Sequence, residues 1–167
     1  MSVVRRHIRA WLAIGAAASS GWVYVQAGPP DDAPRLPDYR GWTHVKSVLI
    51  GPKSAAFATE GGIHHIYANE KAMEGLRTGR FPDGSTLIYD LLEVKEADGV
   101  TSEGSRRRID VMVKDDAHNR DTGGWDFRRF LGAGRRDAEL TPEQRANCFQ
   151  CHERRKDRDF VFSAFRE

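Results

Sequence analysis

Apolar and polar residues alternate along several short segments in the middle of the chain. This period of two is typical of strands that bury one face. Glycine and proline lie between the segments, so the pattern predicts an antiparallel sheet of about five strands. The predicted strands are Trp42–Ile50, Ile63–Tyr67, Ser85–Val94, Ile109–Val113 and Trp125–Leu131.

Two of these strands each place a polar side chain among apolar neighbours. Tyr89 shares a face with Leu87 on one strand, and Asp110 shares a face with Met112 on the next. Asp98-Gly99, which lies between the two strands, is typical of a tight hairpin turn. We therefore expect Tyr89 and Asp110 on neighbouring strands.

Two segments favour helices instead. Asn69 is a suitable N-cap for a short helix over Glu70–Thr78, which Gly79 would end. Thr141-Pro142-Glu143-Gln144 combines a capping threonine, a proline at the first position and a glutamine three residues past the cap. The fold class predicted is α+β, mainly β, with one small inserted helix and one helix near the C-terminus.

The first 27 residues have the pattern of an export signal. A basic start with three arginines precedes an apolar stretch over Ala10–Val25, and Val25-Gln26-Ala27 suits a signal peptidase. A retained membrane anchor is the alternative, although a span needs about 20 residues. Residues 28–35 form a proline-rich linker, and we expect a folded domain over 36–167. The export signal would place this domain in the periplasm.

Composition narrows the class of protein. The chain has 167 residues, of which 40% are hydrophobic and 30% charged, as expected for one globular domain. Its 26 Lys and Arg against 24 acids give a net charge of +2; removing the three arginines of the signal leaves 23 against 24, or −1. This balance argues against nucleic-acid binding. Two cysteines exclude a disulfide scaffold and a four-thiolate zinc site.

The two cysteines stand in Cys148-Phe149-Gln150-Cys151-His152, a C-x-x-C-H sequence that indicates covalent attachment of one haem c. Thiols one helical turn apart can reach the two vinyl groups of a porphyrin, and the adjoining His152 then supplies an axial nitrogen to the iron. The alternatives are a redox dithiol and a zinc site completed by His64-His65. Export favours haem, because haem c is attached outside the cytoplasm.

The sixth iron position has three candidate occupants. Only 15 residues follow His152, and no methionine is among them. Met73 and Met112 lie far upstream, and His64 or His65 on a predicted strand is the other protein candidate. The third possibility, an open or water-bound position, is the one we expect. An open position implies binding of, or chemistry on, a small molecule.

Several segments of residues 36–167 resemble the cytochrome P-460 superfamily, which includes cytochrome c′-beta. The resemblance implies a β-sheet haem c protein that is periplasmic and dimeric, with a five-coordinate iron. The segments that carry it are Gly61–Asn69, Thr78–Ser85, Ile109–Asp115, Cys148–His152 and Phe160–Arg166.

The two branches of this superfamily differ at the haem. The P-460 branch oxidises hydroxylamine and bears a bond from a lysine to the porphyrin, whereas the c′-beta branch lacks that bond, surrounds the distal face with phenylalanine and binds nitric oxide. Tyr89 matches the lysine position and Asp110 matches a carboxylate that helps to deprotonate substrate, so the resemblance implies the c′-beta branch. Both side chains could steer protons in the distal pocket; alternatively, Tyr89 is a strand aromatic and Asp110 an ion-pair partner.

Further site residues are weaker candidates. Phe57 and Phe81 are expected either as walls of the distal side or as core residues. Arg166 resembles a proximal arginine that influences the iron–histidine bond, or it is a solvated terminal charge. Arg106-Arg107-Arg108 could neutralise haem propionates.

The sequence leaves three functions open. The first is binding of nitric oxide or a similar small nitrogen or oxygen ligand at an open iron. The second is an enzyme that oxidises hydroxylamine or nitric oxide, or acts as a peroxidase. The third is simple electron transfer. A redox partner protein and a homodimer are further expectations.

Overall fold

The computed structural model describes residues 35–131, 136–137 and 140–166. These belong to the second of two units into which the chain divides, residues 32–167. The expected export signal and most of the linker lie outside the described residues. Among the helices of the described part, none is long and apolar enough to cross a membrane.

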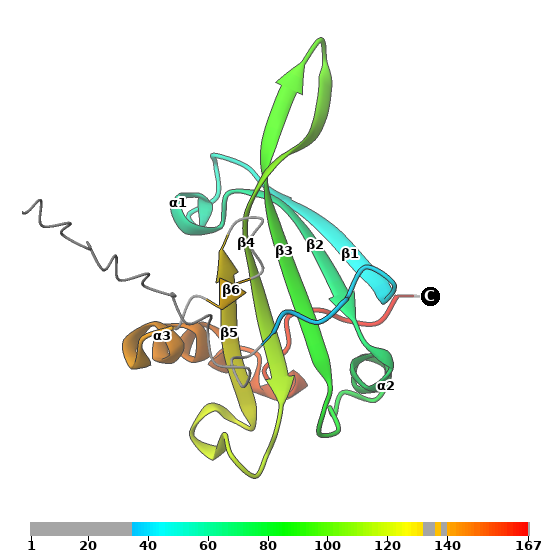
Figure 1. The fold of residues 1–167 in the computed structure, drawn as a ribbon, viewed down its shortest axis with the longest axis vertical. Helices are drawn as coiled ribbons and strands as arrows, with labels where there is room; N and C mark the ends of the chain where they lie inside the picture. The colour runs from blue at the N-terminus through cyan, green and yellow to red at the C-terminus, as the bar shows by residue number, and fades with distance from the viewer. Residues whose placement is uncertain (1–34, 132–135, 138–139, 167) are drawn as a thin grey trace, which may run out of the picture. The chain divides into compact units, whose positions relative to one another are not determined.

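The described unit is built on one antiparallel sheet whose strands are adjacent in chain order (Figure 1). This confirms the predicted α+β, mainly β class. The strands are β1 (Thr43–Ile50), β2 (Gly62–Ala68), β3 (Thr86–Ala97), β4 (Val100–Lys114), β5 (Trp125–Leu131) and the two-residue β6 (Arg136–Asp137). Only β6 was not predicted.

The two predicted helices form with the predicted caps. The Asn69 side chain accepts a hydrogen bond from the backbone N–H of Ala72 at the start of α2 (Glu70–Thr78). Thr141 and Gln144 form a reciprocal capping box at the start of α3 (Pro142–Glu153). Each cap satisfies backbone groups that the first helical turn leaves without partners.

Three short helical segments were not predicted. They are α1 (Phe57–Glu60) and the 3₁₀ turns η1 (Arg120–Thr122) and η3 (Lys156–Arg158). None has a side-chain cap, and each is too short to show a helical period.

The hairpin of β3 and β4 is longer than its sequence pattern indicates. Asp98 and Gly99 both have positive φ angles, 52° and 77°, as a two-residue hairpin turn requires. Residues 93–107 of the hairpin project beyond the neighbouring strands (Figure 1). Nearer the centre of the sheet, Tyr89 pairs with Asp110 across the two strands, as expected.

The two faces of the sheet have different coverings. One face packs against α2, α3 and the segment after α3, and the other packs against residues that precede β1. The first cluster of buried residues is Ala68, Ala72, Leu76, Phe81, Leu87, Trp125, Phe127, Leu140 and Val161. The second is Leu36, Tyr39, Ile88, Ile109, Val111 and Phe130. We call the two sides of the sheet the helix face and the outer face.

Candidate functional site

Cys148, Cys151 and His152 lie on one side of α3, because residues three and four apart share a helix face. All three line a cavity of about 840 Å³ between α3 and the helix face of the sheet. This volume lies in the range of cofactor sites. The α1 segment (Phe57–Glu60), the strands β1 to β5 and the segment after α3 supply the remaining wall.

His152 is held in one tautomer. Its Nδ1 lies 2.7 Å from the backbone oxygen of Phe160, and because a carbonyl only accepts, Nδ1 carries the proton. The Nε2 atom therefore keeps its lone pair. Burial lowers the pKa of His152, which favours the neutral ring. The rings of Phe127 and Phe162 pack edge-on against it, at centroid distances of 5.3 and 5.1 Å.

These residues fit a haem c. Two free thiols one helical turn apart and an imidazole with an available Nε2 face the same cavity. A hydrogen bond to the second ring nitrogen is the usual way in which proteins orient a metal-binding histidine. Cys148 is half-buried, and burial raises the pKa of its thiol, so the free side chain is not an activated nucleophile.

A polar wall lines another part of the cavity. The Tyr89 hydroxyl donates to Glu60 Oε2 at 3.0 Å, and Arg108 donates to the same carboxylate at 2.6 and 2.7 Å. Arg108 Nε also donates to Asp110 Oδ2 at 2.8 Å, and Arg129 Nε donates to Asp110 Oδ1 at 2.6 Å. Two carboxylates and two guanidinium groups thus balance in charge, and Tyr89 is attached to them at one end.

Tyr89 and Asp110 therefore lie on neighbouring strands, as the strand pattern predicted, and both line the cavity. Burial, followed by the charge of Glu60, raises the pKa of Tyr89 far above the physiological range, so the phenol keeps its proton. Asp110 also has the ion pairs that the alternative interpretation proposed, with Arg108 and Arg129. The two interpretations of Asp110 are compatible.

The two adjacent histidines of β2 point to opposite faces. His64 is fully buried on the helix face, where its Nε2 lies 2.5 Å from the backbone oxygen of Glu60. Its Nδ1 has no hydrogen-bond partner, and burial lowers its pKa. His65 bonds to Ser47 and Glu103 instead. Within the described ranges, no group of three or more His, Cys, Asp or Glu side chains is placed to hold a metal ion.

The other candidate residues divide between cavity and core. Met112 lines the cavity, whereas Met73 packs against the buried cluster of the helix face. Phe81 also belongs to that cluster and stacks edge-on with Trp125 at 5.4 Å. Phe57 is 43% exposed. Neither Phe57 nor Phe81 is among the described residues that line the cavity.

The arginine run is engaged by protein groups. Arg106 pairs with Asp90 on the outer face, Arg107 donates to the backbone oxygen of Gly61, and Arg108 belongs to the polar wall. Arg166 is exposed and lies near Lys46, a cavity-lining residue whose pKa is lowered by burial and by the charge of that arginine.

Sequence reasoning missed Glu60 and Arg129. Glu60 lies in α1, a segment without periodicity, and 29 residues separate it from Tyr89. Arg129 does lie on a predicted strand, directly across from Asp110, so the strand register could have indicated it.

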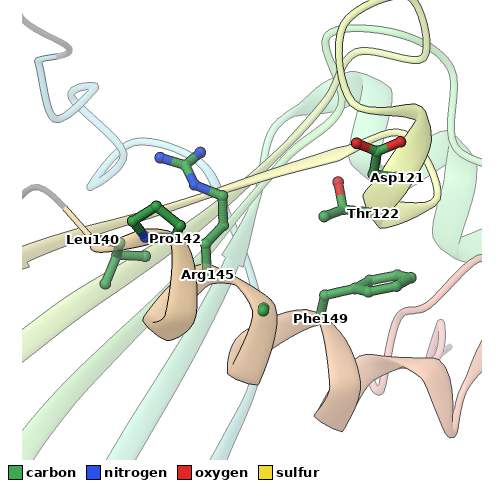
Figure 2. Close-up of a pocket in the computed structure, with 7 residues that line it drawn as sticks. Asp121, Thr122, Leu140, Pro142, Arg145 and Phe149 are labelled. Atoms are coloured by element: carbon green, nitrogen blue, oxygen red, sulfur yellow. The ribbon is translucent and has the colours of Figure 1, made fainter.

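A second, smaller cavity lies on another side of α3. It has a volume of about 330 Å³, and Figure 2 shows that side chains of α3 and of the η1 segment line it. None of Cys148, Cys151 and His152 reaches it. The larger cavity is therefore the candidate site.

Fold and site together define a class of protein: a mainly β protein in which a helix after the sheet presents two thiols and a histidine to a cavity of cofactor size. The family model for cytochrome P460 matches residues 36–163, and the chain belongs to the cytochrome P460 family. It is thus a haem-binding cytochrome, in agreement with the resemblance seen in the sequence. No curated protein matches the chain.

Proposed function

We propose that this protein is a haem c cytochrome with an open iron position that binds nitric oxide or a similar small ligand. One observation carries the proposal. His152 has an oriented, available Nε2, whereas the Nε2 of His64 and the hydroxyl of Tyr89 are both engaged with Glu60. Binding of the iron through His64 Nε2 or through the Tyr89 hydroxyl would have to break these contacts first.

Three residues would hold the cofactor. Cys148 and Cys151 would form thioether bonds to the porphyrin, and His152 Nε2 would bind its iron. The haem supplies an iron that binds diatomic ligands directly. Attachment through α3 would hold the haem on the side of the helix that faces the sheet, and the rings of Phe127 and Phe162 pack against the histidine there.

The polar wall would act on the bound ligand. Burial keeps Tyr89 protonated, and its one hydroxyl proton, which Glu60 accepts in the ligand-free site, would turn to the bound ligand. Arg108 and Arg129 are held in fixed positions by Glu60 and Asp110, so their charges need little reorganisation when a polar ligand enters. This wall differs from the purely aromatic pocket that the c′-beta resemblance implies.

Absorption spectra of the ferrous protein test the open position. We expect broad high-spin bands that shift when carbon monoxide or nitric oxide is added. Sharp, split bands that do not change would show that side chains occupy both axial positions, and would overturn the proposal in favour of an electron carrier.

A matched pair of variants tests the role of the wall. Tyr89→Phe removes the donor, and we expect nitric oxide to dissociate roughly five times faster, since one hydrogen bond contributes about 1 kcal/mol. Tyr67→Phe alters a tyrosine of β2 that packs with the outer-face cluster, and we expect it to leave the rate unchanged. Equal rates in both variants would show that Tyr89 does not contact the ligand.

The two carboxylates of the wall favour a second candidate function, the oxidation of hydroxylamine. This reaction releases protons and electrons together, so it needs bases at the cavity and an external electron acceptor. Asp110 and Glu60 both line the cavity. We expect turnover with an artificial acceptor to fall at least tenfold in Asp110→Asn and to persist in Asp126→Asn, whose aspartate pairs with Arg128 and Arg145. No turnover in the unaltered protein would exclude this function.

Export to the periplasm, a redox partner and a homodimer stay predictions. The basic and apolar start of the sequence supports export, and the family resemblance supports the homodimer.

A further inference from the structure

The segment that follows α3 turns back toward the sheet through an unusual pair of residues. Asp159 and Phe160 both have positive φ angles, 49° and 65°. Consecutive non-glycine residues rarely adopt this left-handed conformation, which costs free energy unless surrounding contacts enforce it. We call residues 159–160 the proximal turn, because Phe160 supplies the carbonyl that binds His152.

Asp159 connects this turn to three separate parts of the sheet layer. Its Oδ2 accepts from the backbone N–H of Phe81 at 3.1 Å, and its Oδ1 accepts from Lys114 Nζ at 2.9 Å. Its backbone oxygen accepts from Trp125 Nε1 at 2.9 Å. Trp125 is fully buried, and Lys114 is only 5% exposed, so these contacts are shielded from water.

The backbone and the ring of Phe160 are both held by neighbouring groups. Its backbone N–H donates to the carbonyl of Arg155 at 2.8 Å, and its ring packs on Phe149 with centroids 5.4 Å apart. A Cβ atom added at Gly123 would lie 2.2 Å from that ring. The carbonyl of Phe160 therefore has little freedom to move relative to His152 Nδ1.

We propose that Asp159 is a positioning residue that fixes the hydrogen-bond acceptor of His152 and thereby sets how strongly this histidine donates electrons to iron. A hydrogen bond from Nδ1–H to a fixed carbonyl raises the basicity of Nε2, and outer partners of this kind tune the metal that a histidine binds. The inference rests on the proposed binding of haem iron by His152. The inference does not require that the protein binds nitric oxide or turns over a substrate.

Three variants of the haem-loaded protein separate anchoring from charge. Asp159→Gly removes the side-chain contacts and tolerates the positive φ angle. Asp159→Asn removes the same charge but keeps one accepting oxygen, which is enough for the hydrogen bond from the backbone N–H of Phe81. Asp116→Ala is the matched control, because Asp116 also pairs with Lys114, at 3.1 Å, yet is 66% exposed and lies outside the turn.

Resonance Raman spectroscopy of the ferrous protein reads the iron–histidine bond directly. We expect the iron–histidine stretching band to move to lower frequency and to broaden in Asp159→Gly. The band should stay near its original position in Asp159→Asn and in Asp116→Ala. The midpoint potential should rise most in Asp159→Gly, because a weaker donor stabilises ferric iron less.

Trp125→Phe gives a second, independent way to loosen the turn. It removes the hydrogen bond to the backbone oxygen of Asp159 while keeping an aromatic ring, and we expect a smaller shift in the same direction. This variant keeps the inference testable if Asp159→Gly does not fold.

Failure of this inference differs from failure of the proposed function. An unchanged band and potential in both Asp159→Gly and Trp125→Phe would overturn the inference, and so would equal shifts in Asp159→Gly and Asp159→Asn, which would indicate charge alone. Absence of an iron–histidine band in the unaltered protein would overturn the open iron position instead. In that case the order of the midpoint potentials still decides the role of Asp159.

Discussion

Asp90 is a fully buried carboxylate on the outer face of the sheet, away from the haem cavity. It accepts hydrogen bonds from Tyr39 at 2.7 Å and from Arg106 at 2.7 and 3.2 Å, and it pairs with Arg40 at 3.1 Å. A buried charge is tolerated only when its hydrogen bonds are satisfied. Asp90 therefore fastens the segment before β1 to the sheet.

Removing this carboxylate should destabilise the protein strongly. We expect Asp90→Ala to lower the free energy of unfolding by about 3 kcal/mol, because Tyr39 and Arg106 lose a buried partner. Glu103→Ala removes a carboxylate that is 54% exposed and pairs with His65, and it should cost no more than about 1 kcal/mol. Denaturant unfolding of both variants makes the comparison, and equal costs would contradict the structural role of Asp90.

His64 should make stability depend on pH. Burial lowers its pKa, so the folded protein keeps the ring neutral while the unfolded chain, with a pKa of about 6.5, takes up a proton. As the pH falls below about 6.5, the unfolded state binds more protons and the free energy of unfolding decreases, by at most about 1.4 kcal/mol per pH unit. His64→Gln should flatten this part of the curve. Unfolding curves measured between about pH 5 and 8 make the test, and identical slopes would argue against a buried neutral ring.

The limits of sequence reasoning are clearest among these residues. Alternation placed Tyr89 and Asp110 correctly, because a strand turns successive side chains to opposite faces. The same alternation turns His64 and His65, the two histidine candidates for the sixth iron ligand, to opposite faces of the sheet. The partner Glu60 could not be found, since its position depends on the path of a segment without a period.

At the scale of elements, short sequence motifs predicted the features that contacts between residues close in the chain stabilise. Both ends of α2, the start of α3 and the Asp98-Gly99 turn follow from capping side chains and from left-handed backbone. The strand β6 and the outer part of β4 pair with segments close in the chain, β5 and β3, but no alternation of apolar and polar residues marks them in the sequence. The proximal turn depends instead on contacts with distant elements, because Asp159 bonds to Phe81 and Lys114.

Asn69 joins two elements, and its loss should be felt in both. Its Oδ1 accepts from the N–H groups of Ala72 and Thr86 at 2.9 and 3.0 Å, and its Nδ2 donates to the carbonyl of Gly84 at 2.9 Å. We expect Asn69→Ala to cost about 2 kcal/mol, more than the roughly 1 kcal/mol typical of a helix cap.

Asn69→Ser is the matched control for this prediction. A serine can still cap α2 through Ala72 but is too short to reach β3, so thermal or denaturant unfolding should show about half the loss. No loss in Asn69→Ser would mean that the contacts with Gly84 and Thr86 contribute little, and an equal loss in both variants would mean that the cap of α2 contributes little.

At the scale of the whole molecule, the two faces of the sheet have different surroundings. Protein side chains cover the outer face, whereas the helix face also borders the haem cavity. The outer face has its own cluster of buried apolar residues, and Asp90 binds the segment before β1 to that face. On the helix face, no residue of α3 is fully buried by protein alone, and several of its side chains line the haem cavity. A helix of 12 residues is marginal in water without a packed face. The docking of α3 should therefore depend on haem, and the sheet should not.

A variant without covalent haem separates these two dependencies. In Cys148→Ser/Cys151→Ser, prepared without haem, we expect amide hydrogens of α3 to exchange at least tenfold faster than in the haem-loaded protein. Those of β4 and β5 near Ile109 and Phe130 should change far less, because both residues are buried on the outer face and neither is among the described residues that line the cavity. Hydrogen exchange followed by mass spectrometry reads the two regions in one experiment. Uniform loss of protection would show that haem supports the whole fold, and unchanged protection of α3 would show that protein contacts alone hold this helix in place.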